Sequence, residues 1–89
     1  MSQVSEPVLT LDHAPLGAPL AVASLRCPQH APHWAQWLEE IGFLPGEQVM
    51  VTARGMPGGD PMVIRVGSST FALRRAEAAC VLLSNGRPA

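Results

Sequence analysis

Three residues of types that commonly bind metal ions stand close together in the first half of the chain. Cys27, His30 and His33 follow one another at steps of three residues, with Pro28 and Pro32 between them. Thiolate and imidazole are the preferred ligands of Zn(II), and they also suit other late first-row divalent ions such as Fe(II). If this loop winds as a helical turn, steps of three place the side chains on one side. The spacing therefore predicts a divalent-metal site.

Three protein ligands would leave a fourth coordination position open. Water, an anion, Glu39, His13 or a residue of a second chain could occupy it, and in the last case the metal would bridge a homodimer. The alternative is that His30 and His33 are solvated loop residues and that Cys27 is a half-buried thiol. No other motif indicates a cofactor, and none is expected to be required.

The remaining polar residues form no enzyme signature. The serines lack a nucleophile-elbow sequence. The glycine-rich stretch 55–61 cannot be a phosphate-binding P-loop, because that loop needs a lysine and the chain has none. Glu39 and Glu40 are adjacent, but neighbours on a helix diverge by about 100°, which indicates a solvated face rather than an acid–base pair. We therefore predict that the protein is not an enzyme.

The hydrophobic pattern predicts one substantial helix, at residues 33–41. On a helical projection Trp34, Trp37, Leu38 and Ile41 fall in one arc, as is typical of a helix packed by one face. We interpret both tryptophans as core residues, with a partner-facing Trp34 as the alternative.

This helix is expected to end in a sharp corner that leads into a strand at 48–54. Gly42 suits the left-handed position that ends many helices. Pro45 and Gly46 match the central pair of a type II turn, in which proline fixes φ and glycine accepts a positive φ. The corner would reverse the chain so that the helix covers the sheet that the next strand enters.

Short strands separated by glycine-containing turns make up most of the remaining chain. They are expected at 19–27, 48–54, 62–66, 70–73 and 80–83, with one helical turn at 74–79. Closure into a barrel removes sheet edges, so we predict an all-β fold with a helical insertion, a small SH3-like barrel of about five strands. Residues 1–89 would form a single domain with its core at about 10–83 and frayed tails at 1–8 and 84–89.

Composition excludes several kinds of partner. The net charge is −1, and hydrophobic residues make up 47% of the chain. A near-neutral chain lacks the basic footprint of nucleic-acid binding and the polybasic cluster of anionic-membrane binding. No apolar run reaches the roughly 18 residues of a membrane span, so direct membrane insertion is not expected. Cys27 and Cys80 could form one disulfide, but two cysteines without a secretory signal favour free thiols in a reducing cytoplasm.

Three segments, in order, resemble the bacterial FeoA family. Residues 37–51, WLEEIGFLPGEQVMV, are similar to its helix, glycine corner and strand. Residues 57–66, PGGDPMVIRV, are similar to its Gly-Asp-Pro hairpin entry, and residues 71–83, FALRRAEAACVLL, to its last helical turn and strand. The resemblance covers roughly residues 10–83. Ile41 departs from the family's usual leucine, and loop 27–34 has an insert-like character.

The resemblance implies an SH3-like barrel and a non-enzymatic accessory role in ferrous iron uptake. Such a protein would be cytoplasmic and would dock on FeoB, the membrane Fe(II) transporter with a GTPase domain, at the inner face of the membrane. The alternative is a free-standing metal-sensing or interaction module similar to the SH3-like C-terminal domain of DtxR-type iron-dependent repressors.

The family likeness transfers scaffold positions and no catalytic residue. They are Gly42, Leu44, Pro45 and Gly46 in the corner, Gly59, Asp60 and Pro61 in the loop, and Leu73, Arg74 and Arg75 before the last strand. We expect the partner to contact Leu44, Met56, Asp60 and Arg74.

Overall fold

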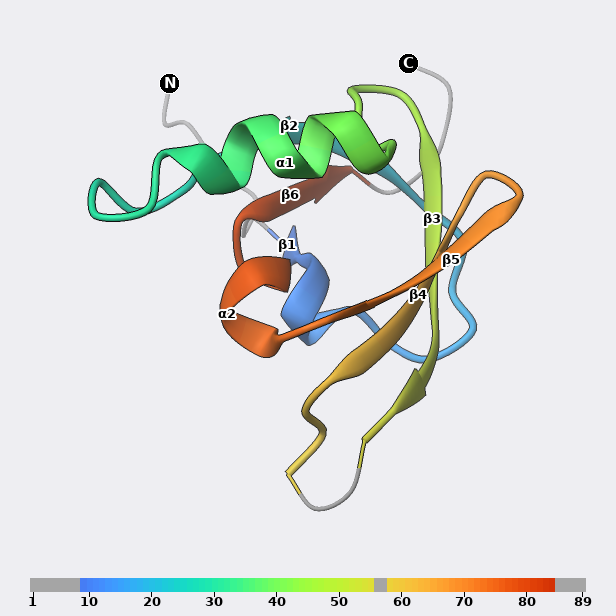
Figure 1. The fold of residues 1–89 in the computed structure, drawn as a ribbon. Coiled ribbons are helices and arrows are strands. Elements are labelled where there is room, and N and C mark those ends of the chain that lie inside the picture. The colour runs from blue at the N-terminus through green and yellow to red at the C-terminus, as the bar shows by residue number, and fades with distance from the viewer. Residues whose placement is uncertain (1–8, 56–57, 85–89) are drawn as a thin grey trace, which may run out of the picture.

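The computed structural model describes residues 9–55 and 58–84. All of its strands join one antiparallel six-stranded sheet with the order β1-β6-β2-β3-β4-β5 (Figure 1). In chain order the elements are β1 (Leu9–Thr10), the 3-10 turn η1 (Leu11–His13), β2 (Leu20–Leu25), α1 (His33–Ile41), β3 (Gln48–Arg54), β4 (Met62–Val66), β5 (Ser69–Leu73), α2 (Arg75–Ala78) and β6 (Val81–Ser84).

The predicted all-β fold with one helical insertion is confirmed, and α1 has the bounds expected from the sequence. Two details differ. The sheet has six strands rather than about five, because the short β1 pairs with β6. The sheet is also not closed, since β1 and β5 are its two edges and do not pair with each other.

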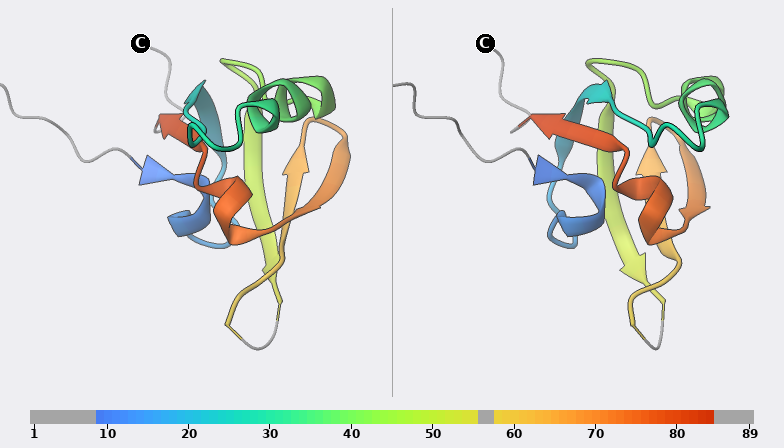
Figure 2. Two further views of the ribbon diagram at one scale, coloured as in Figure 1. Left: turned by 60° about the vertical axis from the view of Figure 1, so that its left-hand side comes forward. Right: turned by 90° about the vertical axis from the view of Figure 1, so that its left-hand side faces the viewer.

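Two register shifts help the open sheet to fold around its core. One lies in β2 between Val22 and Ser24, and the other lies in β3 between Val51 and Ala53. An extra residue in one strand bends it and increases its twist. The strands accordingly curve around a common interior without completing a hydrogen-bonded ring (Figure 2).

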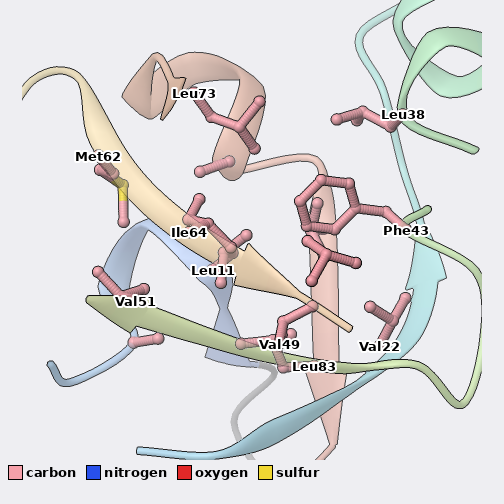
Figure 3. Packing of buried hydrophobic residues seen from close by; sticks show 14 of the residues in the cluster. Leu11, Val22, Leu38, Phe43, Val49, Val51, Met62, Ile64, Leu73 and Leu83 are labelled. Carbon is pink, nitrogen blue, oxygen red and sulfur yellow. The ribbon is translucent and has the colours of Figure 1, made fainter. Parts of the chain in front are cut away.

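Side chains from the sheet, η1 and α1 fill this interior (Figure 3). The apolar pattern of the sequence predicts eight core residues. Six of them are buried, and Ile41 and Phe71 are only partly buried; the six are Val22, Leu38, Val49, Val51, Ile64 and Val81. The largest buried side chains are those of Phe43, Leu11, Leu38, Met62, Ile64, Leu73, Val49, Val51, Val81 and Cys80.

The interpretation of both tryptophans as core residues is wrong for Trp37. Trp37 is 37% exposed, and Trp34 is partly buried against the core. Only Leu38 of α1 is buried, because the short helix lies along the rim of the sheet and presents a narrow stripe to it. Trp37, which belongs to the predicted apolar arc, is therefore partly exposed to solvent.

The fold has two ends that matter for function. At one end, α1 and the connection at residues 42–47 lie across the sheet; we call this the corner end (Figure 1). The loop between β3 and β4 extends from the opposite end of the sheet, and α2 lies on the same side of the molecule as η1 (Figures 1 and 2). We call the region of this loop and α2 the hairpin–α2 end. Strand β3 runs from one to the other.

Candidate interaction and metal-binding surfaces

Backbone hydrogen bonds define the end of α1. Gly42 has φ of 119°, and its N–H donates to the Glu39 carbonyl at 3.1 Å. The Phe43 N–H donates to the Leu38 carbonyl at 2.9 Å. This pair of bonds is the Schellman motif, which a left-handed glycine completes. The buried side chains of Phe43 and Leu38 accompany it, as Figure 3 shows.

The next four residues form the predicted type II turn. The Glu47 N–H donates to the Leu44 carbonyl at 2.9 Å, and Gly46 has φ of 91°. Two further bonds fasten the turn to β2: the Gly46 N–H donates to the Val22 carbonyl at 2.8 Å, and the Val22 N–H donates to the Glu47 carbonyl at 2.9 Å. The backbone of the corner is thus held on both sides.

Because backbone groups hold the corner, its side chains remain available. Leu44 is 44% exposed, and Trp37 of the preceding helix is also exposed. Together with exposed carboxylates they form what we call the corner surface: Trp37, Glu39, Glu40, Leu44 and Glu47. Residues 33–47 contain no Arg or Lys. The charged side chains of this surface are therefore all carboxylates.

Side-chain hydrogen bonds hold the hairpin–α2 end. A carboxylate oxygen of Asp60 accepts a hydrogen bond from the Arg75 N–H at 2.9 Å. The Arg74 N–H donates to the Glu77 carboxylate at 2.8 Å. Asp60, Pro61 and Arg74 line a shallow hollow of about 240 Å³. The loop is thereby tied to the first residue of α2.

The residues expected to contact a partner do not form one surface. Asp60 and Arg74 lie together at the hairpin–α2 end, whereas Leu44 lies at the corner end. The seven residues of β3 separate these ends, and an extended strand of that length spans roughly 20 Å. Met56 is outside the described residues. A single small contact would reach one end or the other.

The structure does not gather the three predicted metal ligands. Cys27 is half-buried, and His30 and His33 are exposed. The His30 ring lies edge-on to Trp34, with 6.4 Å between the ring centroids. Within the part of the chain that the structure describes, no three His, Cys, Asp or Glu residues are placed to hold a metal ion together. The metal site stays a prediction.

Cys27 instead lies next to Cys80, the second of the two cysteines. Cys80 is buried, and its pKa is raised to about 12, first by burial and then by the neighbouring Cys27 thiol. The backbone brings the pair together, because the Arg26 N–H donates to the Cys80 carbonyl at 2.8 Å. Only the pairing of β2 with β6, which the spacing of the cysteines does not reveal, places them side by side.

The family of the chain follows from a comparison with known domains. The model of the FeoA domain matches residues 9–85, which is nearly the whole fold. The chain belongs to the FeoA family. FeoA proteins are implicated in ferrous iron transport and are accessory factors, not a known enzyme family. No curated protein sequence matches the chain.

Solved FeoA structures have the same architecture. FeoA of Stenotrophomonas maltophilia complexed with zinc is 37% identical, with a TM-score of 0.78 over 85% of this chain and 89% of that one. It is described as a prokaryotic SH3 domain protein with a suggested role as a ferrous iron transport activating factor. The expected SH3-like class is thereby confirmed.

Two further structures are more distant. Iron(II) transport protein A of Clostridium thermocellum is 28% identical with a TM-score of 0.72, over 84% of this chain and 44% of that one. A manganese-dependent transcriptional repressor is 21% identical with a TM-score of 0.71, over 90% of this chain and 42% of that one, a likeness that shows the fold alone.

Neither helix in residues 9–55 and 58–84 has the length and apolar character of a membrane span.

Proposed function

We propose that this FeoA protein is a non-enzymatic regulator that docks on the cytoplasmic, GTPase-containing part of a FeoB-like membrane Fe(II) transporter. The observation that carries the proposal is the FeoA family match over residues 9–85. A cytoplasmic location at the inner face of the membrane, reached through the partner, belongs to the same proposal. The near-neutral net charge of −1 supports a protein partner rather than a nucleic acid.

The corner surface is the contact that the geometry favours. Trp37 and Leu44 are two of the three large hydrophobic side chains exposed among the described residues. Exposed apolar side chains rimmed by polar residues are typical of protein contacts, and complementary charge around them steers the partner. The charged residues of the corner surface are the carboxylates Glu39, Glu40 and Glu47. The docking segment of the transporter should therefore be apolar with Arg or Lys beside it.

The hairpin–α2 end supports docking less well. The Asp60 carboxylate already accepts the Arg75 N–H at 2.9 Å, so a partner would have to compete with that bond or share the carboxylate. Arg74 is exposed and remains available for a charged contact. Contacts by Met56, Asp60 and Arg74 form a second, separable part of the proposal.

The proposal is tested by ferrous iron uptake in cells. Deletion of the gene should reduce anaerobic Fe(II) uptake under iron limitation, and the wild-type gene should restore it. Leu44→Asp should fail to restore uptake, because a charge would be buried in the contact. Leu16→Asp is the matched control, since Leu16 is 57% exposed in the loop between η1 and β2.

Uptake that is unchanged after deletion would contradict the proposal. A pull-down separates it from the DtxR-like alternative. The tagged protein should retain the transporter from detergent-solubilised membranes, whereas a free-standing sensing module would take its partner from the soluble fraction.

We also propose that Cys27, His30 and His33 bind a divalent metal, Zn(II) or Fe(II). The zinc bound to S. maltophilia FeoA motivates this, as does the chemistry of the three side chains. Because the structure does not gather them, binding would have to rearrange loop 27–33, which lowers affinity. Calorimetry at neutral pH should nevertheless give a zinc Kd tighter than about 1 μM, and weaker binding would refute the assignment. Binding should be lost in the His30→Ala/His33→Ala double variant, and equal binding by that variant would refute the assignment.

A further inference from the structure

Two cysteines from distant parts of the sequence meet where β2 and β6 pair. Leu25 of β2 is paired with Val81 of β6, and the Arg26 N–H donates to the Cys80 carbonyl at 2.8 Å. Cys27 follows Arg26, at the point where the chain leaves the sheet for the loop that leads to α1. Cys80 lies between α2 and β6. The pairing of the strands therefore fixes the backbones of both cysteines beside each other.

The two thiols differ in their access to solvent. Cys80 is 2% exposed and belongs to the core, and its thiol lies 3.7 Å from the Ala76 carbonyl oxygen. Cys27 is half-buried and packs against the same core from its margin. Both are free cysteines. Cys27 is therefore the more accessible of the two cysteines to an oxidant from solvent.

We propose that Cys27 and Cys80 form a reversible intramolecular disulfide when a peroxide reaches the protein. The proposal concerns a modification site and the class of small molecule that acts on it. The oxidation needs no metal ion, but it uses Cys27, which is one of the predicted metal ligands. Oxidation would consequently remove Cys27 from any metal site.

The chemistry takes two steps. The Cys27 thiolate attacks a peroxide oxygen, so that an S–O bond forms, the O–O bond breaks, and the departing hydroxide takes a proton to become water. The Cys80 sulfur then attacks the sulfur of the adjacent Cys27 sulfenic acid as its proton passes to the departing hydroxide. An S–S bond then forms and the S–O bond breaks, releasing a second hydroxide that is protonated to water. Two thiols are oxidised and one hydrogen peroxide is reduced to two waters.

The disulfide would cross-link two segments that are far apart in the sequence. It would join the start of the loop before α1 to the segment between α2 and β6. A cross-link between residues far apart in sequence restricts the unfolded chain and stabilises the folded one. If the proposed docking holds, the cross-link would also restrain α1, which carries Trp37 of the corner surface.

The test uses the intact reduced protein in a metal-chelating buffer. Hydrogen peroxide should lower its mass by two hydrogens and leave no thiol that iodoacetamide can alkylate after unfolding. Peptide mapping should join Cys27 to Cys80, and dithiothreitol should reverse the change. The melting temperature of the oxidised monomer should rise by about 10 °C.

Matched variants make the outcome decisive. Cys27→Ser should keep the Cys80 thiol and show no rise in melting temperature, whereas the His30→Ala/His33→Ala variant should oxidise like the wild type. Sulfinic acid at Cys27 with Cys80 still alkylatable, or dimers joined through Cys27, would overturn the proposal. FeoB takes no part in the experiment, so its result is independent of whether the docking proposal holds.

Discussion

The two ends of the molecule hold their turns in different ways. At the corner end, every fixing bond joins backbone groups, from Glu39 and Leu38 within α1 to Val22 of β2. At the hairpin–α2 end, backbone bonds within the loop, such as that from the Gly55 N–H to the Pro61 carbonyl at 2.7 Å, are supplemented by the Asp60 side chain, which accepts from the Arg75 N–H. A turn that the backbone holds leaves its side chains free to meet a partner, whereas a turn held by a side chain has already used that group. This contrast supports the corner end as the proposed docking surface.

The largest expected effect is a loss of stability at the corner. Gly42→Val should lower the free energy of unfolding by about 3 kcal/mol, because valine strains at a positive φ and crowds its surroundings. The first added carbon would lie 3.3 Å from a methyl group of Val66. Urea denaturation measures the change.

Gly46→Ala is the matched control for crowding. Gly46 also has a positive φ, 91°, but an added carbon would meet nothing within 4 Å. Backbone strain alone should cost about 1 kcal/mol. Equal losses at the two glycines would show that the corner is not packed against the sheet as the structure has it.

The second prediction asks which end meets the transporter. Leu44→Ala should weaken binding to the isolated cytoplasmic part of FeoB by about tenfold, or about 1.4 kcal/mol. Arg74→Ala should change it less than about twofold, as expected for a charge outside the main contact. Calorimetry with both variants measures the contrast, and the reverse order of effects would move the docking surface to the hairpin–α2 end.

The third prediction concerns the stability of the protein at alkaline pH and its dependence on the buried Cys80 thiol. In the unfolded chain the Cys80 thiol ionises near pH 9.0, whereas in the folded protein its pKa is about 12. The folded state thus keeps a proton that the unfolded state loses, so stability falls as pH rises above 9. The fall should be about 1 kcal/mol between pH 9 and pH 10.

Burial is the largest cause of this shift in the pKa, with further contributions from Cys27, Glu77 and Asp12. Cys80→Ala removes the titrating group, and its free energy of unfolding should change less over the same pH range. The change in the free energy of unfolding with pH is compared, rather than its absolute value, because Cys80→Ala also loses packing contacts. If the free energy of unfolding of Cys80→Ala fell with pH as steeply as that of the wild type, Cys80 would not be the group that causes the loss of stability.

The smallest expected effect is at the side-chain bond of the hairpin–α2 end. Asp60→Ala removes the acceptor of the Arg75 N–H and should cost about 1 kcal/mol. Asp60→Asn retains an acceptor oxygen but loses the negative charge, and about half of that loss is expected. Thermal unfolding of both variants measures this. Wild-type stability in Asp60→Ala would show that the loop is not held by this bond.

The sequence by itself determined the features that depend on neighbouring residues. The bounds of α1, the left-handed Gly42 and the type II turn at Pro45 and Gly46 all follow from local backbone preferences and from hydrogen bonds within a few residues. The order of three motifs was enough to indicate the family. Local sterics act in the same way wherever such a segment occurs, which is why these predictions were confirmed.

The tertiary structure decided what depends on pairing between distant segments. The register of β2 with β6 placed Cys27 beside Cys80, and the turn of the loop toward α2 gave Asp60 its partner in Arg75. The same arrangement left the sheet open and exposed Trp37 at its rim. Residues far apart in a chain are brought together by the total balance of core packing, which no local pattern encodes.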